Sequence, residues 1–125
     1  PRVRVSPEAL ADQLALSQAI DSTLVQAWAT HDEVVRADRE LAGSLTPALK
    51  DSLAVLSTRG STSLAGVAGS LVDIAIGVQA ADTAPAQGLR DGFAACDALV
   101  HALIARWHRL EPQLRGASVA RPNRP

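Results

Sequence analysis

Apolar residues recur along this chain at spacings of three and four, which is the period of helices that bury one face. Ser6, Pro7 and Glu8 resemble a helix start, with a capping hydroxyl, a proline at the first helical position and a carboxylate near the positive end of the helix dipole. We therefore predict a first helix from Ser6 to about Ala29. Its apolar row is Leu10, Leu14, Ile20, Leu24 and Trp28, interrupted by the small polar residue Ser17.

The polar residues 30–33 form either a turn or the solvated middle of a longer helix. Thr46 and Pro47 again resemble a cap followed by a proline at the first helical position, so the chain turns somewhere between His31 and Pro47. An apolar row then continues up to residues 59–63, which are poor in helix formers. We expect a kink, a frayed turn or a short loop there.

Two later rows keep the alternating spacings of a heptad, which is typical of helices that pack at a shallow crossing angle. Pro85 and Gly88 separate the two rows, and Pro112 predicts a break or kink near the end of the second. The first row is Leu64, Val67, Leu71, Ile74, Val78 and Ala81. The second row is Leu89, Phe93, Cys96, Val100, Leu103, Trp107, Leu110 and Leu114.

These patterns predict one all-α domain, because 125 residues with 47% hydrophobic content suffice for a single modest core. Residues 1–83 form an antiparallel helical hairpin, residues 88–115 a C-terminal helix of the same domain, and residues 116–125 a disordered tail. The apolar stripes are broader than a two-helix contact requires. The third helix therefore covers the hairpin in a three-helix bundle, or a second chain completes a four-helix bundle.

Helix–helix packing with a partner is the function that these stripes favour. Gly66, Gly69 and Gly77 accompany the first heptad row, and helical glycine costs stability. They indicate either a tight helix–helix interface or a locally weak helix. The predicted partner interface is Leu64, Val67, Leu71, Ile74, Val78, Phe93, Val100, Leu103 and Trp107.

The charge and cysteine content narrow the function classes. The net charge is −1 and the twelve cationic residues are scattered, which argues against nucleic-acid binding. Residues 1–83 hold ten acidic and six basic residues, and the remainder holds three acidic and six basic. No segment has the apolar length of a transmembrane helix. Cys96 is the only cysteine, so a disulfide within the chain is excluded, and its apolar neighbours predict burial.

Asp97, His101 and His108 are the only candidate metal ligands that the spacing brings near one helical face. Three ligands without a visible fourth are weak support for a metal site. The interpretation we favour is a solvated face on which Asp97 pairs with His101 and Glu111 with His108. We find no catalytic motif and no cofactor loop, and we therefore expect a protein that is not an enzyme and has no cofactor.

The segment Val3-Arg4-Val5-Ser6-Pro7-Glu8-Ala9-Leu10 resembles the opening of the EspC-like type VII secretion target proteins of actinobacteria, a branch of the WXG-type helical-hairpin superfamily. The similarity covers about residues 3–83. In that family the second helix ends in a Tyr-x-x-x-Asp/Glu export signal. Here Val78 stands in place of the Tyr and Asp82 keeps the acidic position, which makes the signal degenerate.

This resemblance implies a carrier or targeting partner, commonly a helical heterodimer, that serves a larger secreted effector. It also implies a protein that is cytoplasmic before export and is secreted without a cleaved signal peptide. A second hypothesis is a cytoplasmic, homo-oligomeric adaptor or assembly subunit. The third is a metal-dependent helical enzyme built on Asp97, His101 and His108.

Overall fold

The computed structural model describes residues 6–57, 62–80 and 84–120, and all regular structure within these ranges is helical. The predicted all-α class is therefore confirmed. The elements are α1 (Pro7–Leu41), a short 3-10 helix η1 (Ala42–Ser44), α2 (Pro47–Ser57), α3 (Leu64–Ala80) and α4 (Gln87–Ala120). None of the helices in these ranges combines the length and the apolar character that a membrane crossing requires.

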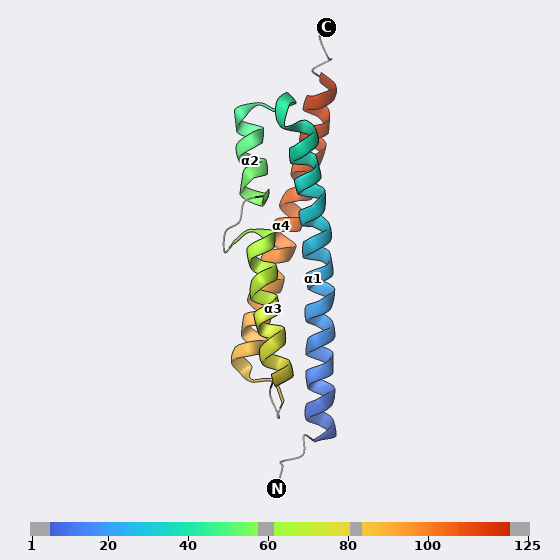
Figure 1. The fold of residues 1–125 in the computed structure, drawn as a ribbon, viewed down its shortest axis with the longest axis vertical. Helices are drawn as coiled ribbons and strands as arrows, with labels where there is room; N and C mark the ends of the chain where they lie inside the picture. The colour runs from blue at the N-terminus through green and yellow to red at the C-terminus, as the bar shows by residue number, and fades with distance from the viewer. Residues whose placement is uncertain (1–5, 58–61, 81–83, 121–125) are drawn as a thin grey trace.

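Two long helices and two short ones form an elongated bundle (Figure 1). Helices α1 and α4 run in the same direction along most of its length. Helices α2 and α3 follow each other in the opposite direction, with α2 beside the C-terminal half of α1 and α3 beside the N-terminal half. Both short helices contact α1 and α4, so the apolar rows of all four helices meet in one core.

Hydroxyl side chains cap three of the helices. Ser6 Oγ accepts a hydrogen bond from the backbone N–H of Ala9 at 3.1 Å, and Thr46 Oγ1 accepts one from Leu49 N–H at 3.3 Å. The predicted caps at these two positions are confirmed. Ser63 Oγ accepts a bond from Gly66 N–H at 3.2 Å and so caps α3. Each bond satisfies a backbone donor that a helix start otherwise leaves unpaired.

Helix α1 does not end near Ala29, because residues 30–33 continue it as the middle of a longer helix. Thr30 is buried, and no proline or glycine interrupts α1 after Pro7. The chain turns only at η1 and the two residues that follow it. The buried row of α1 keeps heptad spacing throughout and consists of Leu16, Ile20, Thr23, Ala27, Thr30, Val34 and Ala37.

This buried row corrects the predicted apolar face of the first helix. Of the predicted row, Ile20 is fully buried, whereas Leu10, Leu14 and Trp28 are 58%, 58% and 45% exposed. Small residues such as Ala27 take the core positions, and small side chains let helices approach closely. Leu10, Leu14 and Trp28 therefore lie outside the core row, on an exposed flank of α1.

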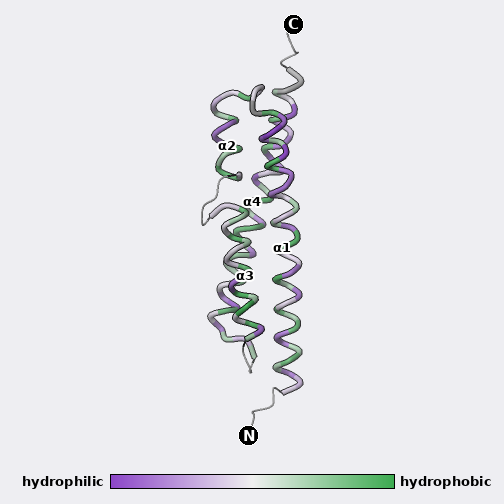
Figure 2. Tube along the Cα trace, in the orientation of Figure 1, coloured by the Kyte–Doolittle hydropathy of each residue, from purple (hydrophilic) through white to green (hydrophobic). Residues whose placement is uncertain are grey.

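The heptad rows of α3 and α4 do lie in the core, as predicted. Every member is buried or packs against the buried cluster, apart from Ala81, which lies outside the described residues. Figure 2 shows apolar residues along much of α3 and hydrophilic residues along the C-terminal half of α1. The chain break was predicted at residues 59–63. Residues 59–61 of this segment also lie outside the described residues.

Helix α4 continues through Pro112 and ends at Ala120, which contradicts the predicted break and the predicted tail at residues 116–120. Leu114, just beyond the proline, is fully buried and anchors this last part of the helix to the core. Pro112 itself is exposed. Residues 121–125 of the predicted tail lie outside the described residues.

Candidate interaction surfaces

The residues predicted to face a partner contact the chain's own helices instead. Leu64, Val67, Leu71, Val78, Val100, Leu103 and Trp107 are all buried, and Ile74 and Phe93 pack against the same cluster. In this fold the heptad rows are used within the molecule. Any surface for a partner must therefore consist of other side chains.

The first position of the predicted, degenerate export signal does not lie on the surface. Val78 is fully buried, so its side chain is not accessible to a receptor in the folded chain. Asp82 lies outside the described residues. A receptor that recognises side chains at both positions would have to bind before α3 packs.

Five exposed apolar side chains form what we call the outer α1/α3 face: Leu10, Leu14, Trp28, Val72 and Ile76. The first three lie on α1, and the last two, which are 43% and 60% exposed, lie one turn apart on α3. The described residues include seven exposed large hydrophobic side chains, and five of them belong to this face. The exposure is therefore concentrated on two helices that pack against each other.

The contacts with α4 place these side chains on one side of the helix pair. Asp12 and Thr23 of α1 point to α4, where their side chains meet Arg90 at 3.7 Å and Asp97 at 2.8 Å. On α3, Gly77 faces Leu89 of α4. Helical periodicity puts the outer α1/α3 face on the flanks of α1 and α3 that point away from these contacts.

Helix α3 is predominantly apolar, and its few polar side chains are all exposed. Its 17 residues include only three polar ones, Ser70, Asp73 and Gln79. A helix of this kind is usually buried on all sides. Yet Gly69, in line with Val72 and Ile76, is exposed, and a Cβ added to it would meet nothing within 4 Å. One side of α3 is thus both apolar and uncovered.

Within the described residues, the charged side chains of α3 and of α1 before Arg36 are all acidic. Helix α1 carries no lysine or arginine before Arg36, and α3 carries none at all. Asp21 is exposed and lies seven residues from both Leu14 and Trp28, which places it in line with them. The face therefore combines an apolar surface with carboxylates.

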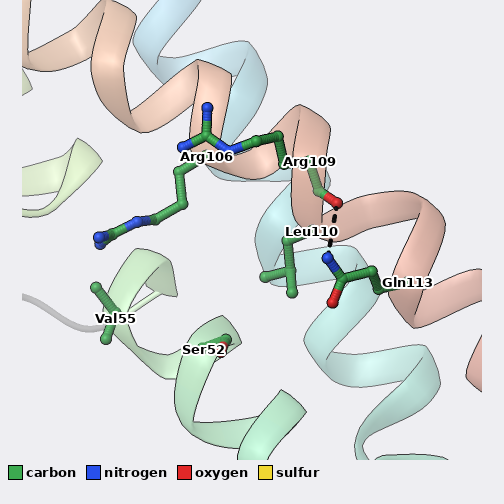
Figure 3. Close-up of a pocket in the computed structure, with 6 residues that line it drawn as sticks. All are labelled: Ser52, Val55, Arg106, Arg109, Leu110 and Gln113. Carbon is green, nitrogen blue, oxygen red and sulfur yellow. Dashed lines mark hydrogen bonds between the residues drawn. The ribbon is translucent and has the colours of Figure 1, made fainter.

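A second surface is a groove between α2 and α4 (Figure 3). Its volume is about 350 Å³, and it is lined by Ser52, Val55, Arg106, Arg109, Leu110 and Gln113. Leu110 is buried, whereas Val55 is 51% exposed. Figure 3 shows both arginine side chains beside the groove and the amide of Gln113 donating to the backbone carbonyl of Arg109, at 3.4 Å. Sequence reasoning did not identify this groove.

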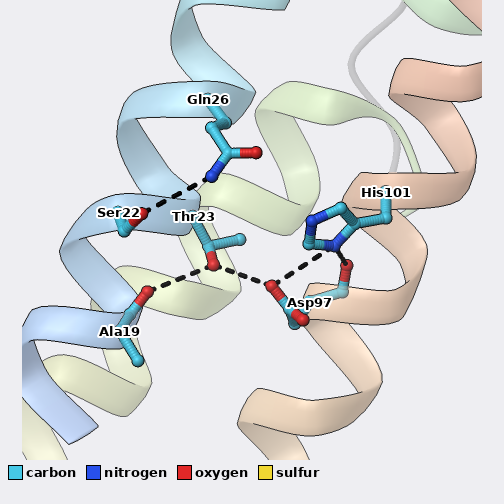
Figure 4. Close-up of polar contacts among 6 residues, drawn as sticks. All are labelled: Ala19, Ser22, Thr23, Gln26, Asp97 and His101. Atoms are coloured by element: carbon cyan, nitrogen blue, oxygen red, sulfur yellow. Dashed lines mark hydrogen bonds and ion pairs between the residues drawn. The ribbon is translucent and has the colours of Figure 1, made fainter. Parts of the chain in front are cut away.

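The proposed metal ligands do not come together. Asp97 and His101 are paired as predicted, with 3.4 Å between Oδ1 and Nδ1, and Nδ1 also lies 2.8 Å from the Asp97 carbonyl (Figure 4). His108 does not join them, and the described residues contain no group of three potential ligands. Glu111 pairs with Arg115 at 2.9 Å rather than with His108.

Asp97 also accepts a hydrogen bond from α1 (Figure 4). The hydroxyl of Thr23 lies 2.8 Å from Asp97 Oδ1 and 3.1 Å from the carbonyl of Ala19, and Thr23 is only 4% exposed. The bond fixes α1 against α4, because a buried hydroxyl needs a polar partner. Its role is structural.

Thr23→Val is expected to lower the free energy of unfolding by about 1 kcal/mol, because the isosteric side chain keeps the volume and loses the hydrogen bond to Asp97. Urea denaturation followed by circular dichroism measures this change. Ser22→Ala is the matched control, since Ser22 is exposed and its hydroxyl meets only Gln26, at 3.5 Å. Equal losses in both variants would contradict a specific bond between α1 and α4.

Cys96 is part of the α4 row and packs against the core. Burial raises the pKa of its thiol, which disfavours the reactive thiolate. Cys96 is half-buried rather than fully buried, and these surroundings do not favour a nucleophilic thiolate.

The comparisons with known proteins add no relative. No protein-family model matches the chain, and neither curated proteins nor solved structures give a match. The function must accordingly be argued from the two surfaces.

Proposed function

We propose that this protein is a non-enzymatic interaction protein that binds a helix of another protein on the outer α1/α3 face. The observation that carries the proposal is the composition of α3, which is predominantly apolar and leaves Val72 and Ile76 exposed. A helix laid along α1 and α3 would cover both flanks. The chain would then supply most of a four-helix bundle and the partner the remaining helix.

The charge on this face favours a partner different from the chain itself. Two copies joined symmetrically through the outer α1/α3 face would bring together surfaces whose described charges are carboxylates, including Asp21. Like charges opposed at an interface are unfavourable. A helix with an apolar seam and basic flanking residues is complementary to the face.

Among such interaction proteins, we propose the type VII secretion target class, in which the chain is the carrier or targeting partner of a larger secreted effector. The support is the resemblance of the opening segment, of which Ser6 caps the long first helix, together with the all-α fold. The buried Val78 fits a chain that relies on its partner for export rather than on its own signal.

The test is co-purification of the tagged chain from its native host, with light scattering of the chain alone. We expect one helical partner at equal stoichiometry, lost from the double variant Val72→Asp and Ile76→Asp. Ala98→Asp with Ala102→Asp is the matched control, because these exposed residues of α4 have the same four-residue spacing. A stable homo-oligomer that survives the Val72 and Ile76 changes would contradict the proposal and favour the adaptor hypothesis.

A further inference from the structure

The groove between α2 and α4 differs from the outer α1/α3 face in its charge. Arg106 and Arg109 are three residues apart, so both side chains project from neighbouring positions of α4 (Figure 3). No carboxylate lines the groove, and neither arginine belongs to an ion pair within the described part of the chain. The groove therefore presents two cationic groups without an anionic partner.

A second pair of arginines in the same chain has a different environment. Arg36 and Arg39 of α1 are also three residues apart and exposed. They line a shallow hollow together with Asp32, and Arg36 also lies beside Glu33 and Glu40 in another. Negative groups of the chain itself thus surround the α1 pair. The pair on α4, Arg106 and Arg109, differs because no carboxylate is among the described residues that line its groove.

The groove also has an apolar part. The buried Leu110 forms its floor, and Val55 of α2 offers a half-exposed methyl surface opposite. Ser52 and Gln113 add hydrogen-bonding groups at the edges. A ligand complementary to these residues carries an apolar side chain next to carboxylates.

We infer that the groove between α2 and α4 is a docking site for an acidic amphipathic helix of a partner protein. A helix lying along the groove presents carboxylates one turn apart, which is the separation of Arg106 and Arg109 on α4. An apolar side chain from the same face then reaches Leu110 and Val55. Carboxylate–guanidinium pairs are charge-assisted hydrogen bonds and supply the specificity.

This inference does not depend on the proposed function. The groove involves α2 and the C-terminal half of α4, whereas the outer α1/α3 face involves α3 and the N-terminal part of α1. The charges of the two surfaces are opposite. Loss of binding at one surface can therefore be separated from loss at the other by variants.

The experiment titrates the full chain with a synthetic helical peptide that carries two glutamates four residues apart and a leucine directly before the second glutamate, so that all three side chains lie near one face. Binding is measured by fluorescence anisotropy at low salt and located by amide chemical shifts. We expect shifts at Ser52, Val55 and Leu110, and an affinity at least about ten-fold higher than that of the peptide with glutamines in place of the glutamates. Added salt should weaken the binding.

The double variant Arg106→Gln and Arg109→Gln should lose at least about ten-fold in affinity, whereas Arg36→Gln with Arg39→Gln should change it less than about two-fold. Circular dichroism confirms that both variants fold. Absence of saturable binding, or equal losses in the two double variants, would overturn the inference. Tighter binding of a single-stranded oligonucleotide of the same charge would overturn it too, because the groove would then favour phosphates over an acidic helix.

Discussion

Leu71→Asp is expected to lower the free energy of unfolding by about 4 kcal/mol or more, because it removes a buried side chain and places a carboxylate without a partner in the core. Leu71 is 0% exposed and lies in the row with which α3 packs into the bundle. The total free energy of unfolding of a domain is typically only about 5 to 15 kcal/mol. Urea denaturation followed by circular dichroism should show a large fall in the midpoint.

The adjacent residue is the control for this prediction. Val72 is 43% exposed, so Val72→Asp keeps its carboxylate in water and should cost less than about 1 kcal/mol. The two variants introduce the same group one residue apart and differ only in the direction of the side chain. A small effect of Leu71→Asp, or losses of equal size, would contradict the packing of α3 described here.

The helix starts and two of the core rows were predictable because they depend on local chemistry and on period alone. Ser6 and Thr46 are caps because a hydroxyl before a proline suits a helix start, whatever the rest of the fold does. The α4 row from Leu89 to Leu114 keeps heptad spacing over many turns, and no alternative face of that helix is as apolar.

The face of α1 was not predictable by the same rule. Its core row uses Thr23, Ala27 and Thr30, while Leu14 and Trp28 lie outside the core. Side-chain size does not separate the two flanks here, because the core row mixes Leu16, Ile20 and Val34 with small residues where neighbouring helices approach closely. How closely the neighbouring helices approach depends on tertiary packing. The spacing of apolar residues along one helix gives no information about it.

The candidate surfaces were missed for a related reason. A heptad row such as Leu64 to Val78 has the same pattern whether it packs within the chain or against a partner, and the structure shows the first arrangement. The outer α1/α3 face becomes visible only when the core row is known. Arg106 and Arg109 are close in the sequence, but their groove exists because α2 packs opposite them.

Pro112→Ala is expected to raise the free energy of unfolding by about 2 kcal/mol. Proline inside a helix costs about 3 kcal/mol relative to alanine, because it lacks the N–H that would bond to the carbonyl of the residue four positions earlier, here His108, and its ring crowds that carbonyl. Alanine also frees the unfolded chain, which opposes the gain by about 0.4 to 1 kcal/mol. The net effect remains stabilising.

The size of this gain depends on whether α4 really continues beyond Pro112 to Ala120, as the structure shows. Gln113→Ala is the control, since Gln113 is exposed on the same turn and its replacement should change the stability by less than about 0.5 kcal/mol. Thermal and urea unfolding of both variants provide the measurement. If Pro112→Ala gave no gain in stability, α4 would end before the proline in solution. Leu114→Ala would then lower the free energy of unfolding by far less than the roughly 2 to 5 kcal/mol expected for a fully buried leucine.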